Sequence, residues 1–254
     1  MTVALIVVNI AVFVWQLTLS SDPSSSTSPR IAGLSQSDEV TLEYGVMPYR
    51  LLHPGSDCGL SGRRVVCQGQ GGYEASTRLD SPPWWATVFT SMFLHGGILH
   101  IAFNMLFLWI FGNNVEDSMG RPRFIAFYLL AGIVAAYTQA LLTASSTVPA
   151  IGASGAIAGV LGGYLLLFPR ARVLTVVLII LFVTIIEIPA AILLAIWFVL
   201  QFLPALGQVT TNAAGGGGVA YWAHVGGFVF GLAAIKLFAN RYRGKALGPP
   251  GTFA

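Results

Sequence analysis

Apolar stretches alternate with short polar segments along most of this chain, and one long polar segment lies near its start. A helix that crosses the ~30 Å hydrocarbon core of a membrane needs roughly 20 apolar residues, with about 17 as the lower limit. Six stretches approach or meet this length: residues 3–19, 96–112, 124–143, 154–168, 188–205 and 219–239. The pattern predicts an all-α, polytopic membrane protein, a six-helix bundle with a long outer loop between helices 1 and 2.

The segment 172–186 fits this pattern less well. It is apolar but short, rich in Val, Ile and Thr, and followed by Glu187 and Pro189. A seventh span would carry the basic C-terminal residues to the outer side, whereas Lys and Arg favour the cytoplasmic side of a membrane. We therefore expect a re-entrant or interfacial piece whose backbone is covered by other helices.

Basic residues orient the six predicted spans. If the N-terminus is cytoplasmic, the inner side receives eight Lys and Arg residues, while the short outer loops 144–153 and 206–218 contain neither. Both termini are therefore predicted to be cytoplasmic, and we expect a multi-pass protein of a bacterial plasma membrane. The eight residues are Arg121, Arg123, Arg170, Arg172, Lys236, Arg241, Arg243 and Lys245.

These predictions describe a single membrane domain over residues 1–254. Residues 1–19 form its first transmembrane helix, 20–91 the outer loop, 92–240 a five-helix portion and 241–254 a cytoplasmic tail. The outer loop holds both cysteines, Cys58 and Cys67. A loop outside the cell meets an oxidising compartment, but the sequence alone leaves a disulfide and two free thiols equally open.

The composition excludes a water-soluble globule. Apolar residues make up 55% of the chain and charged ones 9%, and the mean hydropathy is +0.75. The net charge of +3 is not gathered in a basic run, so nucleic acid is not expected as a partner. Cations beside apolar spans instead suit a lipid bilayer with anionic headgroups.

Five polar side chains lie within the apolar spans, where each needs a partner or a function. His95, His100 and Asn104 begin the second span, Ser154 opens the fourth, and His224 lies early in the sixth. These spans run in the same direction, so the five lie at a similar shallow depth. At ~100° per residue, His100 and Asn104 are about 40° apart and His95 is about 180° from Asn104. We expect His95 to hold the loop or the helix end in place.

A metal site is not expected. Helical metal-binding pairs usually have i, i+4 spacing and a carboxylate nearby, whereas His95 and His100 are five apart with no acid at that depth. No cofactor is predicted either.

Glycines follow both Ser154 and His224 at spacings of four. Such small residues let membrane helices approach closely, and this packing alone would explain them. Close packing would also bring the Ser154 hydroxyl within reach of the His224 imidazole, which can accept its proton. With no Asp or Glu at that depth, only a dyad can form. The glycine pairs are Gly155 and Gly159, and Gly227 and Gly231.

Together these residues resemble the rhomboid family of intramembrane serine proteases. The resemblance covers the membrane portion but not the middle of the outer loop. The matching motifs are His95-x4-His100-x3-Asn104, Gly152-x-Ser154-Gly155-x3-Gly159 and Ala223-His224-x2-Gly227-x3-Gly231, in this order on spans two, four and six.

The resemblance implies an active serine endopeptidase with Ser154 as the nucleophile and His224 as general base and then acid. It implies that His100 and Asn104, with the backbone N–H of Ser154, donate to the oxyanion, while Gly152 shapes the approach. The implied substrates are single-pass transmembrane proteins, cleaved near the outer end of their helix.

Two alternatives remain open: a catalytically silent binding or quality-control protein on the same scaffold, and a small-solute transporter. One position also departs from some relatives. Ala158, four residues after Ser154, replaces a bulky aromatic residue that stacks on the histidine there. Another group must therefore orient His224.

Overall fold

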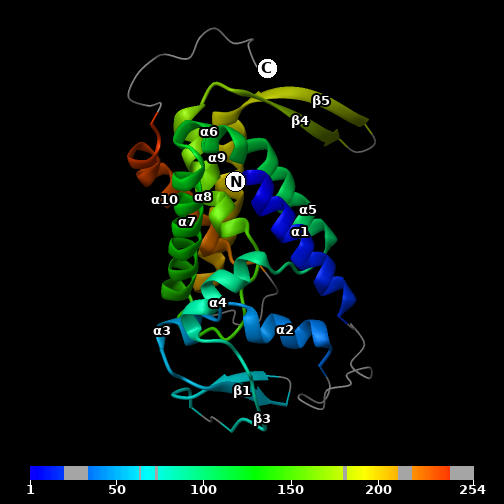
Figure 1. The fold of residues 1–254 in the computed structure, drawn as a ribbon, viewed down its shortest axis with the longest axis vertical. Coiled ribbons are helices and arrows are strands. Elements are labelled where there is room, and N and C mark those ends of the chain that lie inside the picture. Colours follow the sequence, from blue (N-terminus) through cyan, green and yellow to red (C-terminus); the bar gives the residue numbers. More distant parts are fainter. Residues whose placement is uncertain (20–33, 63, 72–73, 180–181, 211–218, 241–254) are drawn as a thin grey trace.

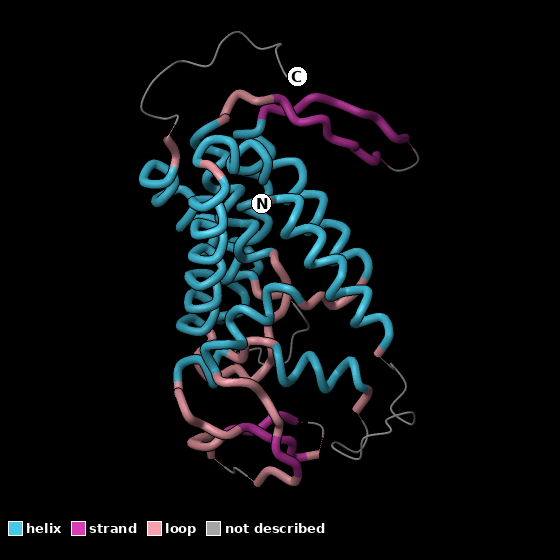
Figure 2. Tube along the Cα trace, viewed as in Figure 1, coloured by secondary structure: helices cyan, strands magenta, loops and turns pink. Residues whose placement is uncertain are grey.

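The computed structural model describes residues 1–19, 34–62, 64–71, 74–179, 182–210 and 219–240. Its architecture is mainly helical, as predicted, with two small sheets at opposite ends of a helix bundle (Figures 1 and 2). We call the end with the first sheet the cap end and the other the hairpin end.

All six predicted spans form helices. Four helical runs have the length and composition to cross a membrane: Ile98–Met119, Arg121–Leu142, Ala190–Gln208 and Tyr221–Phe238. Thr2–Thr18 and Ser154–Leu167 are apolar but shorter, so a count of six crossings stays a prediction. The elements are α1 (Thr2–Thr18), α5 (Ile98–Phe107), the π turn η2 (Leu108–Gly112), α6 (Asn113–Met119), α7 (Arg121–Leu142), α8 (Ser154–Leu167), α9 (Ala190–Thr210) and α10 (Tyr221–Phe238).

Helix α8 lies at the centre of the bundle. Every residue from Gly155 to Tyr164 is buried, so this helix is apolar on all sides, as a fully enclosed helix must be. It packs most extensively against α10 and α7. Its first residue, Ser154, therefore enters the interior of the protein directly from the preceding loop.

The cap lies at the opposite end from the second sheet and comprises residues 34–93 (Figure 1). Its three-stranded antiparallel sheet has the order β2-β1-β3, with Cys58 opposite Cys67 in the register. The two cysteines form a disulfide, which settles the pairing that the sequence left open. The cap elements are α2 (Gln36–Tyr44), α3 (Pro48–Leu52), β1 (Cys58–Ser61), β2 (Arg64–Cys67), β3 (Thr77–Arg78), α4 (Trp84–Thr90) and the 3₁₀ turn η1 (Ser91–Phe93).

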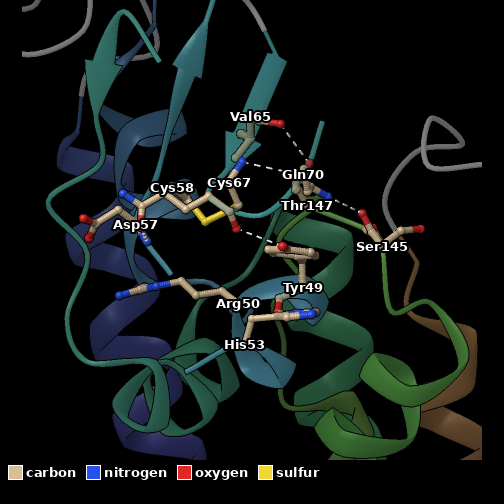
Figure 3. The surroundings of a disulfide bond; sticks show 12 residues. Tyr49, Arg50, His53, Asp57, Cys58, Val65, Cys67, Gln70, Ser145 and Thr147 are labelled. Carbon is tan, nitrogen blue, oxygen red and sulfur yellow. Dashed lines mark hydrogen bonds between the residues drawn. A yellow bond between two sulfur atoms is a disulfide. The ribbon is translucent and has the colours of Figure 1, made fainter. Parts of the chain in front are cut away.

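Contacts from the cap hold the loop 143–153, which leads into α8. The Tyr49 backbone N–H donates to the Ser146 carbonyl at 2.9 Å, and Gln70 Nε2 donates to the Ser145 carbonyl at 3.0 Å. Thr147 Oγ1 donates to the carbonyl of Val65 on β2 at 3.1 Å (Figure 3). The cap therefore packs against this loop and holds it through α3, β2 and the residues that follow β2.

The segment 172–186 differs from its prediction. It belongs to an antiparallel hairpin, β4 (Arg172–Ile179) and β5 (Phe182–Pro189), which projects from the end of the bundle (Figure 1). The re-entrant interpretation is wrong, because helices do not cover the hairpin: Leu174, Val176, Val183 and Ile185 are exposed, and the two strands pair with each other. The Val, Ile and Thr residues of this segment favour strands. An interfacial location stays a prediction.

Removal of the disulfide should destabilise the cap. Cys58→Ser combined with Cys67→Ser releases a short covalent loop, and we expect a loss on the order of 2 kcal/mol. The cap should then be cleaved faster in limited proteolysis, with the bundle intact. Ser61→Ala, at an exposed position of the same sheet, is the control. Equal proteolysis of the double variant and the parent would contradict this expectation.

Candidate active site

Ser154 and His224 meet at the junction of α8 and α10. Ser154 is the first residue of α8, and His224 lies in the first turn of α10. The Ser154 Oγ and the His224 Nε2 are 2.7 Å apart, although 70 residues separate them in the chain. At this distance a hydroxyl can donate its hydrogen to an unprotonated imidazole nitrogen.

Glycines produce this proximity. A Cβ placed on Gly227 would lie 2.1 Å from the Gly155 carbonyl oxygen, and one on Gly231 would lie 1.9 Å from the Gly159 carbonyl oxygen. The backbones of α8 and α10 are thus in direct contact, at a separation that no larger residue permits. The close packing expected from the sequence is present.

The other ring nitrogen of His224 faces α9. Its Nδ1 lies 2.8 Å from Gln201 Oε1, and the Trp197 ring lies one turn earlier on α9, with its centroid 5.9 Å from that of His224. Both residues were missed in the sequence. Gln201 could have been selected as a candidate from the sequence, because it is a polar side chain inside the predicted span 188–205.

No carboxylate takes the position of Gln201. Glu116 accepts the backbone N–H of Thr2 at 2.7 Å, and Glu187 pairs with Arg172 at 3.2 Å at the base of the hairpin. The arrangement is a serine–histidine pair with a neutral amide behind the histidine.

His100 approaches the serine through Gly152. The Gly152 backbone has a φ of 118°, which side-chain-bearing residues rarely adopt, and a Cβ there would lie 2.8 Å from His100 Nε2 and 3.7 Å from Ser154 Oγ. The backbone N–H of Gly96 donates to His100 Nδ1 at 3.3 Å. The His100 hydrogen is therefore on Nε2, the nitrogen that faces Gly152.

Asn104 lies one turn beyond His100 but is engaged elsewhere. Its Nδ2 donates to the His100 carbonyl at 2.8 Å, and the side chain is buried. One amide hydrogen is thus used within the helix. The structure brings Asn104 next to His100 and shows no hydrogen bond from it to Ser154.

His95 is buried between α1 and His100. Its backbone N–H donates to Gln16 Oε1 at 2.9 Å, and Gln16 Nε2 donates to the His95 carbonyl at 3.3 Å. The His95 ring meets the His100 ring edge-on, with centroids 5.1 Å apart. These contacts join the loop before α5 to α1.

A small cavity of about 40 Å³ borders the serine. Its polar lining includes Ser91, Gln139 and Ser154, and Gln139 Oε1 also accepts the backbone N–H of Ala223 at 3.2 Å. A volume of ~10–15 Å³ suffices for one water molecule. The cavity is therefore large enough to hold water beside Ser154.

Among the residues that the structure describes, no group of three His, Cys, Asp or Glu side chains could hold a metal ion. The chemistry available at this site is that of the serine, the two histidines and the amides around them.

The fold and this geometry define a class: a helical membrane protein with a serine and a histidine paired between two helices. A model of the Rhomboid domain matches residues 82–241, more than half of the chain. The chain belongs to the rhomboid family.

Individual relatives match over part of their length. The chain is 40% identical to "Rhomboid protease GluP" of Bacillus subtilis over 94 residues, 37% of this chain and 18% of that protein. It is 32% identical to "Rhomboid protein 1, mitochondrial" of Saccharomyces cerevisiae over 154 residues, 58% of this chain and 40% of that protein. With "RHOMBOID-like protein 4" of Arabidopsis thaliana it shares 32% over 161 residues, 63% of this chain and 37% of that protein.

The chain therefore spans at most 40% of the length of these relatives. They include bacterial and mitochondrial proteins, so the comparisons assign a membrane protein and not a particular membrane.

Gly227→Ala should separate α8 from α10. Its Cβ would collide with a backbone oxygen, and overpacking of this kind costs roughly 1–3 kcal/mol. We expect a lower thermal transition in detergent and the loss of any reaction that needs the pair of Ser154 and His224. The matched control is Gly207→Ala on α9, where a Cβ would meet nothing within 4 Å. A Gly227→Ala protein as stable and reactive as this control would contradict the packing argument.

Proposed function

We propose that this protein is an intramembrane serine endopeptidase that cleaves single-pass transmembrane proteins by a dyad of Ser154 and His224. The observation that supports it most is the 2.7 Å separation of Ser154 Oγ and His224 Nε2. Membership of a family with a relative named as a protease adds to it.

In the first step, Ser154 Oγ attacks the carbonyl carbon of the scissile peptide bond as its hydrogen passes to His224 Nε2. The carbonyl oxygen becomes an oxyanion. His224 then gives the proton to the departing amine nitrogen, which leaves an acyl ester on Ser154. Water attacks this ester, His224 takes a proton from it and returns one to Ser154, and the carboxylic acid is released.

The oxyanion would be stabilised by three hydrogen-bond donors of this chain. The backbone N–H of Ser154 lies at the N-terminus of α8, where it has no partner within the helix. His100 Nε2 carries a hydrogen and faces Gly152. Asn104 would contribute the amide hydrogen that does not bond to the His100 carbonyl. Gly152 leaves room for these groups to meet.

The substrate must expose a peptide bond that a helix would hide. Residues that weaken helices near the cleavage position would lower the cost of unwinding. We propose that cleavage occurs near the cap end, because the loop and helix starts around Ser154 face that end.

We further propose that the cap end faces outward and that both termini lie on the cytoplasmic side of a bacterial plasma membrane. Residues 1–254 would then form one rhomboid domain, with 1–19 as its first helix, 20–91 as its outer loop and 92–240 as the catalytic portion. The argument is the charge distribution: basic residues are absent from the loops 144–153 and 206–218.

The purified protein should cleave a model transmembrane substrate in liposomes, and Ser154→Ala should abolish cleavage. A fluorophosphonate probe should label the parent at Ser154 and should label His224→Ala far more slowly. Binding of the substrate by both parent and Ser154→Ala, with cleavage by neither, would favour a silent binding protein instead. Solute flux that survives Ser154→Ala would favour a transporter.

Loss of an oxyanion donor should lower turnover without preventing folding. Asn104→Ala should lower turnover by roughly 10²- to 10³-fold, as for donors in soluble acyl-transfer enzymes. The readout is the cleavage rate at saturating substrate, together with the thermal transition. Asn113→Ala is a matched control, because Asn113 also donates to a carbonyl four residues earlier but lies at the far end of the same helical run. Equal activity of the two variants would remove Asn104 from the proposed oxyanion site.

A further inference from the structure

The histidine of the proposed dyad has a second hydrogen-bond partner that the rhomboid motifs quoted above do not contain. Gln201 Oε1 lies 2.8 Å from His224 Nδ1. Gln201 belongs to α9, whereas Ser154 and His224 belong to α8 and α10. A third helix, α9, therefore contacts the His224 imidazole on the side opposite Ser154.

This contact determines which ring nitrogen carries the hydrogen. An amide oxygen only accepts hydrogen bonds, so His224 Nδ1 must donate to it. A neutral imidazole carries a single N–H hydrogen, and Nε2 is then left with a free lone pair. That lone pair points at the Ser154 hydroxyl, 2.7 Å away. The other tautomer would place two lone pairs against each other at Gln201 and would leave no base for Ser154.

An aromatic ring of α9 also packs against the His224 imidazole. Trp197 lies four residues before Gln201, on the same face of α9, and its ring is 5.9 Å from that of His224. The ring of Trp197 also lies 5.9 Å from that of Phe228 on α10, and Phe198 packs against Phe228 at 4.8 Å. These contacts fix α9 against α10 at the level of His224. Ala158 offers no ring from α8; α9 supplies Trp197 and the hydrogen-bond acceptor, and Tyr221 of α10 meets the imidazole edge-on at 6.4 Å.

We infer that Gln201 is a positioning residue for catalysis, which orients His224 and selects its reactive tautomer. The inference rests on the proposed function and deepens it, by assigning to a neutral amide the orienting part that an aspartate has in soluble serine proteases. An amide provides this acceptor without placing a charge inside the membrane, where a charged side chain is costly. It orients the ring but gives less stabilisation to the imidazolium that forms during the reaction.

The alternative role for Gln201 is structural, as a partner that merely satisfies the imidazole N–H. Such a role would affect stability, substrate affinity or both. A positioning role acts on the chemical step and moves kcat. Substitutions that keep the length of the side chain but change its acceptor can separate the two.

The test compares Gln201→Met, which keeps the length and removes the acceptor, with Gln201→Glu, which keeps an acceptor. Gln208→Met, on the same helix, is the control, since Gln208 donates to the Val219 carbonyl and does not contact His224. For each protein we would measure kcat and KM on a transmembrane substrate in liposomes, the rate of fluorophosphonate labelling, and the thermal transition.

We expect Gln201→Met to lower kcat by roughly 10- to 100-fold, part of the ~10²–10⁴-fold that a positioned general base contributes. KM should be unchanged, and labelling at Ser154 should slow in parallel. Gln201→Glu should keep a kcat within a few-fold of the parent's, because a carboxyl group in either protonation state offers an oxygen to His224 Nδ1. Gln208→Met should have the kcat of the parent.

Two results would overturn the inference while leaving the proposed function intact: a Gln201→Met protein with the parent's kcat, or equal losses of kcat in the Met and Glu variants. If the first of these results is accompanied by a raised KM, the role of Gln201 is structural. Failure of the proposed function has a different signature, which is cleavage that survives Ser154→Ala.

Discussion

Direct backbone contact between α8 and α10 is the constraint on which the rest of the site depends. Hydrophobic association does not drive helices together inside a membrane, because lipid is as apolar as the side chains, so close van der Waals packing must do so. Here carbonyl oxygens of Gly155 and Gly159 lie where the Cβ atoms of larger residues at 227 and 231 would be. A side chain as short as serine reaches an imidazole on the next helix only at this separation.

Three glutamine amides connect the remaining helices to this central pair. Gln16 on α1 exchanges two hydrogen bonds with the backbone of His95, and His95 in turn contacts His100. Gln139 on α7 accepts the backbone N–H of Ala223, next to His224, and Gln201 on α9 contacts His224 itself. A polar group inside a membrane is costly without a partner, and the partners of these three glutamines lie on or beside the site. The same energetic requirement thus fixes both the packing of the bundle and the position of the dyad.

The sequence predicted what depends on composition and spacing. Helices formed at all six apolar stretches, because long apolar runs in lipid satisfy their backbones as helices. The proximity of Ser154 and His224 could be predicted because polar residues are few in those spans and glycines follow both at spacings of four. The sequence did not predict Gln201, although the cost of a polar residue in a span applies to it equally. Its partner depends on how α9 rotates against α10, and residue spacing within one helix contains no information on that rotation.

Pairings between distant segments were the other difficulty. The segment 172–186 is predicted to be re-entrant or interfacial but belongs to a strand hairpin, because an apolar run of this length fits a buried helix or a strand equally well. Cys58 and Cys67 are compatible with either redox state until the antiparallel register places them opposite each other.

The cap belongs to the site as much as the helices do, because the loop that leads into Ser154 obtains its hydrogen bonds from it. Backbone bonds between Val46 and Ala150 run in both directions, at 3.1 and 2.9 Å, and the Gly152 N–H donates to the Ser91 carbonyl at 2.8 Å. These bonds hold the loop in which Gly152 has its positive φ and lies against His100. The disulfide fixes the sheet, the sheet and α3 fix the loop, and the loop fixes the glycine that lets His100 approach Ser154. The approach of His100 to Ser154 therefore depends on cap contacts to the loop that carries Gly152, while the position of the base is determined within the bundle by α9 and α10.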